Sequence, residues 1–335
     1  MAIDGNSLVH RSYHAQANSG VPTWAVRGLL TQLVHAVERI RPSAVVIGFD
    51  DPARSVRRER WPEYKAHRTE KLDTLVEQLA LAAETMRELG VTVVVPPGLE
   101  ADDVLASTAA HARVIGAETV VVTSDRDAFA LIDDTTRVLR IINGGVEASP
   151  LMTAERLVSL CGVRPDQYRD FAALRGDPSD NLPGVRGIGP RTAARLLAEF
   201  GCAGAAFDDL EAVRDRLGAG VARRLADVDA RAHWELNCQV MAMHHDVAID
   251  PGKLPLDPDR VTATFRAQQL TWTVGDAVRV LADVDAPPNE PPAWVDTWTG
   301  GWATAAPRPA MPRLPVRKPA MAQLSLFDDS CLGRD

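Results

Sequence analysis

The fold is decided by the stretch Thr119-Val120-Val121-Val122-Thr123-Ser124-Asp125-Arg126-Asp127, in which a β-type run ends in a pair of acids. Two earlier apolar runs end in the same way, at Asp4 and at Asp50. Segments with helical spacing lie between these runs, and strands that alternate with helices at this period are typical of βαβ units. We therefore predict an α/β fold with a mostly parallel, twisted sheet flanked by helices.

The expected elements fill the first part of the chain. We expect strands over 1–4, 44–49, 91–95 and 119–123, and helices over 24–41, 72–89 and 101–115. From 151 to about 245 the sequence changes to short helical segments with Gly and Pro between them. Residues 287–335 contain Pro, Ala and Trp without a period, which is typical of a disordered tail.

Nine carboxylates recur at strand ends or helix starts, and a parallel sheet would gather them at one rim. Any one of them could simply cap a helix, but capping does not explain five separate segments that end an apolar run with acid. Oxygen ligands without Cys or His suit Mg²⁺ or Mn²⁺, and several of them suit two ions, the arrangement used in phosphodiester cleavage. The acids are Asp4, Asp50, Glu100, Asp102, Asp103, Asp125, Asp127, Asp177 and Asp180.

The composition argues against a membrane protein and against an exported one. The 335 residues are 46% hydrophobic and 24% charged, without a run of about 18 apolar residues. The four cysteines lie far apart, with no CxxC pair, which fits a reducing compartment. We expect a cytoplasmic protein with no membrane partner, acting as a monomer.

The net charge of −8 argues at first against a nucleic-acid partner. The distribution of charge changes this conclusion, because 54–71 holds seven Lys and Arg against three Glu, a local charge of +4. A solvated helix face is the alternative explanation for such a run.

A glycine-rich turn, Gly184-Val185-Arg186-Gly187-Ile188-Gly189, precedes a helix that we expect to begin at Pro190. Such a turn exposes backbone N–H groups to a phosphate, and a helix–hairpin–helix grips duplex DNA without contacting base edges. A plain connection between helices is the alternative. The acids at 177–180 directly before the turn favour DNA binding.

Taken together, these motifs closely resemble the flap-endonuclease-like 5′ nucleases, specifically the 5′-3′ exonuclease domain of bacterial DNA polymerase I. The resemblance covers residues 1 to about 250, in order. It rests on Asp4-Gly5-Asn6-Ser7, Phe49-Asp50, Tyr64-Lys65-Ala66-His67-Arg68, Glu100-Ala101-Asp102-Asp103, Ser124-Asp125-Arg126-Asp127, Arg175-Gly176-Asp177-Pro178-Ser179-Asp180-Asn181-Leu182-Pro183-Gly184-Val185 and Gly187-Ile188-Gly189.

The resemblance implies a PIN-like nuclease core over 1–150, including a helical arch at about 54–90, and a helix–three-turn–helix DNA-binding region over 151–286. It also implies two or more divalent ions. One group of family ligands matches Asp4, Asp50, Glu100, Asp102 and Asp103, and the other matches Asp125, Asp127, Asp177 and Asp180.

The resemblance further assigns roles outside the acids. Lys65 and Arg68 would stabilise charge on the scissile phosphate, Tyr64 would steer the strand, and Arg57 would contact a phosphate. Gly187, Gly189 and Thr192 match the DNA-binding hairpin, where the family often holds a monovalent cation such as K⁺.

The sequence departs from its relatives in three respects. It has only three residues before Asp4, and Arg126 and Arg191 stand where lysine is frequent. Only about 85 residues follow the nuclease-like region, too few for a polymerase. We therefore expect a free-standing nuclease.

A short apolar peptide lies near the end of the sequence. Gln323, Leu324, Leu326 and Phe327 resemble the peptide by which bacterial replication and repair proteins dock on the β sliding clamp. A chance apolar cluster in a disordered tail is the alternative.

These observations predict a 5′-3′ exonuclease and flap endonuclease that acts on DNA, or on RNA primers paired to DNA, in replication and repair. A non-catalytic, structure-specific DNA-binding scaffold held at the clamp is the alternative. A PIN-type ribonuclease is a third candidate, but such enzymes lack the hairpin and the arch.

Overall fold

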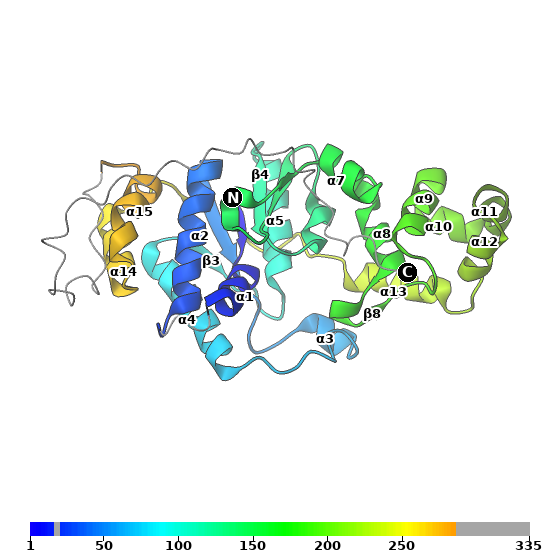
Figure 1. The fold of residues 1–335 in the computed structure, drawn as a ribbon, viewed down its shortest axis with the longest axis horizontal. Helices are drawn as coiled ribbons and strands as arrows, with labels where there is room; N and C mark the ends of the chain where they lie inside the picture. Colours follow the sequence, from blue (N-terminus) through cyan, green and yellow to red (C-terminus); the bar gives the residue numbers. More distant parts are fainter. Residues whose placement is uncertain (17–20, 286–335) are drawn as a thin grey trace, which may run out of the picture.

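The computed structural model describes residues 1–16 and 21–285, and a seven-stranded sheet lies at its centre (Figure 1). The strand order is β3-β2-β1-β4-β5-β6, with the short β9 paired to β2. Pairs among β1 to β5 are parallel, whereas β6 and β9 run antiparallel to their neighbours. The strands are β1 (Ala2–Asp4), β2 (Ala44–Gly48), β3 (Thr92–Val94), β4 (Thr119–Thr123), β5 (Thr136–Arg140), β6 (Leu151–Met152) and β9 (Gly252–Lys253).

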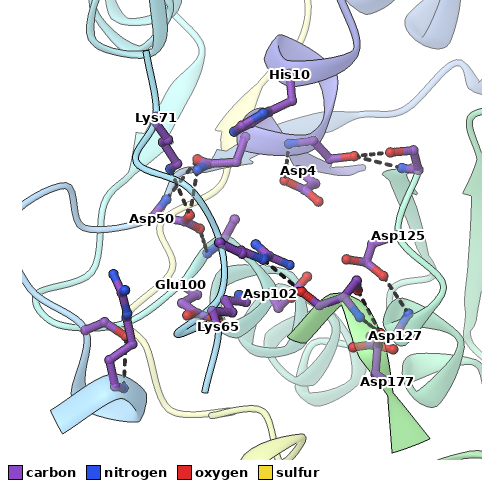
Figure 2. Close-up of a pocket in the computed structure, with 18 of the residues that line it drawn as sticks. Asp4, His10, Asp50, Lys65, Lys71, Glu100, Asp102, Asp125, Asp127 and Asp177 are labelled. Atoms are coloured by element: carbon purple, nitrogen blue, oxygen red, sulfur yellow. Dashed lines mark hydrogen bonds and ion pairs between the residues drawn. The ribbon is translucent and has the colours of Figure 1, made fainter. Parts of the chain in front are cut away.

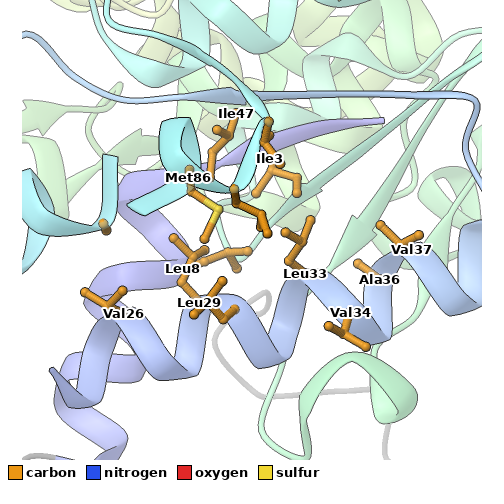
Figure 3. Close-up of a cluster of buried hydrophobic side chains, with 14 of the residues drawn as sticks. Ile3, Leu8, Val26, Leu29, Leu33, Val34, Ala36, Val37, Ile47 and Met86 are labelled. Atoms are coloured by element: carbon orange, nitrogen blue, oxygen red, sulfur yellow. The ribbon is translucent and has the colours of Figure 1, made fainter. Parts of the chain in front are cut away.

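Successive side chains of the strands point to opposite faces of the sheet, and a hydrophobic core lies on each face. Ile3 and Val122 belong to the first core, whereas their neighbours Ala2 and Val121 belong to the second. The first core is covered by α1 (Gly5–Gln16), α2 (Trp24–Ile40) and α4 (Asp73–Leu89), and Figure 3 shows the apolar side of α2 facing the strands. The second core is covered by α5 (Ala101–Val114).

The helical region extends from the second core rather than forming a separate unit. Phe129 and Tyr168 pack edge to face, with ring centroids 5.5 Å apart, and join the sheet to the helices. The helices are α7 (Ala154–Cys161), α8 (Tyr168–Arg175), α9 (Pro190–Phe200), α10 (Ala203–Asp208), α11 (Leu210–Leu217), α12 (Ala219–Leu225) and α13 (Ala230–Val240). Other short elements are α6 (Gly145–Ala148), η1 (Asp127–Leu131), η2 (Pro165–Gln167) and η4 (Thr271–Thr273).

The predicted helical region of 151–286 is wrong in its last part. After α13 the chain returns to the central sheet, where β9 pairs with β2 and two helices, α14 (Pro258–Ala267) and α15 (Val274–Leu281), follow. Val261, Phe265 and Val278 on these helices are buried in the first core. The burial of these apolar faces against α2 and α4 explains the return.

The predicted arch at 54–90 consists of two different parts in the structure. Its second half, α4, is a core helix with Leu75, Met86 and Leu89 buried, because its apolar side chains face the sheet. Only the first half stands away from the core. We call residues 54–72 the strap; it contains α3 (Val56–Arg60) and an irregular connection to α4.

The other predicted strands and helices are confirmed within two residues at their ends. Helix α1 and strands β5 and β6 were not predicted. The tail at 287–335, with Gln323, Leu324, Leu326 and Phe327, lies outside the described residues. Within 1–16 and 21–285, no helix combines the length and apolar character needed to cross a membrane.

Candidate active site

A cavity of about 2210 Å³ opens at the carboxyl ends of β1 and β4. The strand order reverses direction between these two strands, which is where open α/β sheets bind ligands. We call it the acid cavity. Figure 2 shows carboxylates reaching it from several elements, and seven of the nine predicted acids line it: Asp4, Asp50, Glu100, Asp102, Asp125, Asp127 and Asp177.

Local hydrogen bonds fix the first acids in place. The Asp4 carboxylate accepts from the Ser7 backbone N–H (2.8 Å) and from the Thr123 hydroxyl (2.7 Å), so β1 and β4 share one acid. Asp50 accepts from the Asn6 side-chain amide at 2.6 Å and from the Ala101 backbone N–H at 3.0 Å. Asp50 is thereby held between α1 and the start of α5.

Burial and mutual repulsion raise the pKa values of three acids in this cavity. Burial, together with the charges of Asp50 and Asp125, raises the pKa of Asp4 to about 7. Burial and the neighbouring charges of Asp125 and Asp4 raise the pKa of Asp102 well above its ordinary value. The pKa of Asp127 is raised in the same way, by burial and then by Asp125 and Asp177.

These mutually repelling oxygens are a suitable ligand set for hard divalent cations. Within 1–16 and 21–285, no group of three or more His, Cys, Asp or Glu side chains is placed closely enough to hold a metal ion. The acids line the wall of a cavity instead of converging on one point. Like charges on that wall repel one another, and a bound cation would relieve the repulsion.

A second group of acids lies on residues 176–181, which we call the acid turn. It comprises β7 (Gly176–Asp177), η3 (Pro178–Asp180) and Asn181, and β8 (Leu182–Pro183) follows it. The Asp177 carboxylate accepts from the Ser179 backbone N–H at 2.8 Å and so caps the short helix. Asp180 is buried against the strap, and burial raises its pKa despite the nearby Lys65 and Arg68.

The strap brings cations to this acid group. The Lys65 ammonium donates to Glu100 Oε2 at 3.2 Å and lies 3.9 Å from Asp180 Oδ2. Burial disfavours the charged form of Lys65, but Glu100 and Asp180 hold its pKa above the ordinary value. Arg68 pairs with Asp180 through its guanidinium. Both predicted phosphate-stabilising side chains therefore lie at the acids.

Arg57 and Asp103 require a correction. Two parallel hydrogen bonds of 2.8 and 2.7 Å join the Arg57 guanidinium to the Asp103 carboxylate, and both residues are buried. Asp103 also accepts from the backbone N–H groups of Glu100 and His244, so both of its oxygens are occupied. Arg57 further donates to the Val240 carbonyl.

The structure therefore places Arg57 and Asp103 in a buried ion pair and not at the wall of the acid cavity, where their predicted roles as a phosphate contact and a metal ligand would require them. Burial opposes the charge of Asp103, but Arg57 holds its pKa below the ordinary value, as expected of a buried ion pair. The pair joins the strap, α5 and the segment after α13.

Tyr64 also differs from its predicted role. Its ring is buried beside Leu182 and Val240, and its hydroxyl donates to Glu100 Oε2 at 3.1 Å. A side chain that is only 5% exposed does not steer a nucleic-acid strand. The structure makes Tyr64 a support for Glu100.

Helix α1 adds residues that were not predicted. Asn6, His10, Arg11 and His14 line the acid cavity. Burial, then the charges of Lys71, His14 and Arg68, lower the pKa of His10 to about 4, so it is neutral at physiological pH. The spacing of these side chains at 6, 10, 11 and 14 was the available signal, because i, i+4 positions share a helix face.

A second cavity of about 680 Å³ lies at the predicted hairpin, residues 184–192. Gly187, Gly189 and Thr192 line it together with Arg175, Arg186, Arg191 and Arg224. Gly187 has a φ of 78°, a left-handed conformation that favours glycine. The Arg224 guanidinium donates to the Gly187 carbonyl at 2.7 Å, so α12 braces the turn.

The hairpin and the acid turn touch through two glycines. A Cβ built on Gly176 would lie 2.2 Å from the Gly184 nitrogen, and one on Gly184 would lie 2.2 Å from the Arg175 carbonyl oxygen. Only glycines allow the two backbones to approach so closely. The acid cavity and the hairpin cavity consequently share a backbone contact.

Comparisons with known proteins agree with this geometry. Residues 1–161 match the family model described as "5′-3′ exonuclease, N-terminal resolvase-like domain", and residues 163–260 match "5′-3′ exonuclease, C-terminal SAM fold". DNA polymerase I of Mycobacterium bovis is 40% identical over 234 residues, which are 68% of this chain and 26% of that protein. The chain thus spans about a quarter of the length of this curated relative.

Solved structures share the fold. T5 5′-exonuclease with divalent metal ions (zinc) bound has a TM-score of 0.57 at 19% identity, covering 84% of this chain and 93% of that one. The catalytic core of Rad2 in complex with DNA substrate has a TM-score of 0.54 at 17% identity, covering 84% and 90%. Together these comparisons confirm the α/β fold with a helical C-terminal region.

Proposed function

Since this chain belongs to the 5′-3′ exonuclease family, we propose that it is a divalent-metal-dependent 5′-3′ exonuclease and flap endonuclease acting on DNA. One observation carries the proposal: seven of the nine predicted carboxylates line one cavity, and Lys65 enters it from the strap. Divalent cations would relieve the repulsion among the acids, and their charge would help to bind a phosphate.

Two groups of acids would hold the metals. Mg²⁺ or Mn²⁺ suits them, because every ligand is an oxygen. Bound cations would supply Lewis acidity that activates water and offsets negative charge on the phosphate. The first group is Asp4, Asp50, Glu100 and Asp102, and the second is Asp125, Asp127, Asp177 and Asp180.

Lys65 and Arg68 would stabilise the charge that develops on the scissile phosphate. Their present partners, Glu100 and Asp180, hold both cations at the cavity before substrate arrives. A cation fixed in place in this way needs little reorganisation during the reaction. His10 would remain neutral beside them and contribute no charge.

The substrate is proposed to be DNA with 5′ ends or flaps, and also RNA paired to DNA. The Rad2 core has been captured with DNA substrate, and T5 5′-exonuclease with divalent metal ions, which supports both assignments by analogy of fold. Gly187, Gly189 and Thr192 would grip duplex phosphates through exposed backbone N–H groups and the start of α9. Backbone oxygens of the hairpin are also the proposed site for K⁺, with the Gly187 carbonyl left to Arg224.

We propose a monomeric cytoplasmic protein that docks on the β sliding clamp through Gln323, Leu324, Leu326 and Phe327. The Leu-Leu-Phe cluster followed by two aspartates supports this assignment. Deletion of residues 320–335 should spare cleavage of free oligonucleotides and remove clamp association in a pull-down assay. Clamp binding that persists in the truncated protein would reject the tail motif.

The nuclease proposal is tested with a 5′-labelled flap duplex in Mg²⁺, in EDTA and with Asp125→Ala. We expect cutting near the flap junction that needs metal and is lost in the variant, while flap binding is retained. Tight binding without cutting in Mg²⁺ would instead indicate the DNA-binding scaffold.

A further inference from the structure

The strap and the acid turn are joined by hydrogen bonds that involve backbone groups on both sides. The Lys65 backbone N–H donates to the Asp180 carbonyl at 2.9 Å, and the Arg68 guanidinium donates to the Ser179 carbonyl at 3.1 Å. In the opposite direction, the Asn181 side-chain amide donates to the Glu63 carbonyl at 2.8 Å. Figure 1 shows the result at the level of elements, with α3 lying next to β8.

Lys65 adopts a backbone conformation that it does not prefer. Its φ of 55° lies in the left-handed region, which is uncommon for a residue with a long side chain. Such a conformation persists only where surrounding contacts hold it. Within the strap, the Ala66 backbone N–H donates to the Glu63 carbonyl at 3.1 Å, and the acid turn adds two contacts from outside, at Lys65 itself and at the same Glu63 carbonyl.

Asn181 is well suited to supply one of these contacts. It also has a left-handed backbone, with a φ of 59°, and it ends η3 directly after Asp180. Asn tolerates this conformation better than most residues, and its side chain can hydrogen-bond at the same time. The turn that carries Asp177 and Asp180 therefore ends in a side chain directed at the strap.

We infer that Asn181 is a positioning residue for Lys65. By holding the Glu63 carbonyl, it fixes the strap in the conformation that places the Lys65 ammonium at Glu100 and Asp180. Asn181 acts only through Lys65 and touches no reacting atom. The inference rests on the proposed function, because Lys65 is proposed to act in the cleavage step.

The test compares Asn181→Gly with Gln269→Gly. Glycine tolerates the left-handed backbone and removes the side chain with its amide, and Gln269 is a matched control because it has a φ of 56° at the end of α14, away from the acid cavity. Loss of one hydrogen bond should lower kcat of Asn181→Gly roughly tenfold, with KM little changed. The Gln269→Gly control should keep wild-type kcat.

A double variant separates positioning from a general loss of structure. Where Lys65 is already Ala, adding Asn181→Gly should lower kcat by less than about twofold, because residues that act as a unit are not additive. A full tenfold further loss in that background would overturn the inference. So would an Asn181→Gly protein with unchanged kcat.

A protease assay gives a measurement that does not depend on cleavage activity. In EDTA, trypsin should cut the strap after Arg68 or Lys71 several times faster in Asn181→Gly than in wild type or Gln269→Gly. If wild type cleaves no flap at all, the proposed function fails, and this assay still decides whether Asn181 holds the strap. Equal strap cutting in the three proteins would overturn that role.

Discussion

The acid cavity and the hairpin cavity share Arg175 and Pro190 in their walls but differ in charge. The first gathers most of the predicted acids, whereas four arginines and no acid line the second in the part of the chain that the structure describes. A net charge of −8 averages over both sites and conceals them. Charge must therefore be judged by site when a nucleic-acid partner is considered, and the two sites should fail in different ways when altered.

The largest effect is expected for Asp102→Asn in the acid cavity. It keeps the shape of the side chain but removes a carboxylate, and cleavage should fall on the order of 10³-fold because metal-derived charge stabilisation is worth several kcal/mol. Affinity for a flap duplex should stay near that of wild type. Single-turnover cleavage rates and equilibrium affinities for the flap duplex would both be measured. Glu70→Gln, which alters an exposed acid at the same cavity, is the control. A large loss of affinity with little loss of rate would contradict it.

Arg57→Met tests whether an arginine beside the acids serves stability instead of phosphate binding. Removing one partner of a buried ion pair leaves Asp103 uncompensated, so unfolding free energy should fall by about 3–5 kcal/mol. Arg58→Met, on the exposed side of the same short helix, should change it by less than about 0.5 kcal/mol. Urea denaturation monitored by circular dichroism measures both. Similar stability for the two variants would disprove the structural role.

Lys65→Ala removes the cation that the strap places in the acid cavity. Loss of one preorganised electrostatic group should lower turnover by roughly 10²-fold, while KM changes little. Lys71→Ala should have a smaller effect, because the Lys71 ammonium lies 3.9 Å from Asp50 Oδ2 and its side chain is 43% solvent-exposed. Steady-state kinetics on the flap duplex distinguishes them. Unchanged turnover in Lys65→Ala would refute its proposed role.

The smallest effect on turnover is expected at the hairpin cavity. Replacing Arg186 and Arg191 together by Ala should weaken duplex binding and reduce the slope of log affinity against log salt by about 2, one for each lost phosphate contact. Turnover at saturating DNA should not change. Binding measured across a salt series, with Arg223→Ala as a control outside this cavity, provides the slopes. An unaltered slope would mean that these arginines do not contact phosphate.

The sequence predicted the sheet, the rim of acids and the hairpin, because each is a local pattern. Strand runs that end in acid imply the rim, since parallel strands share one edge. By contrast, α1 was missed because Gly5, Asn6 and Ser7 are poor helix formers, although packing against the first core overrides their propensity. Local composition also gave no sign that α14 and α15 return to α4 and α2, because an amphipathic face does not identify its partner.

Burial accounts for the errors at the site. Asp102 and Asp103 are neighbours with the same chemistry, yet one faces the acid cavity and the other pairs with Arg57. Spacing alone shows which helix face a residue occupies, but not what lies opposite that face. Tyr64 and Arg57 were given exposed roles for the same reason, since a sequence shows charge and aromaticity but not solvent exposure.

The close approach of Gly176 and Gly184 has a consequence for where a strand is cut. Because no side chain fits between them, the element proposed to grip the duplex and the one proposed to cut it are in direct backbone contact. If the hairpin binds the duplex as proposed, this contact would help to fix the distance between the duplex end and the incision. The length of the cleaved product would then depend on the geometry of this contact and not on the base sequence.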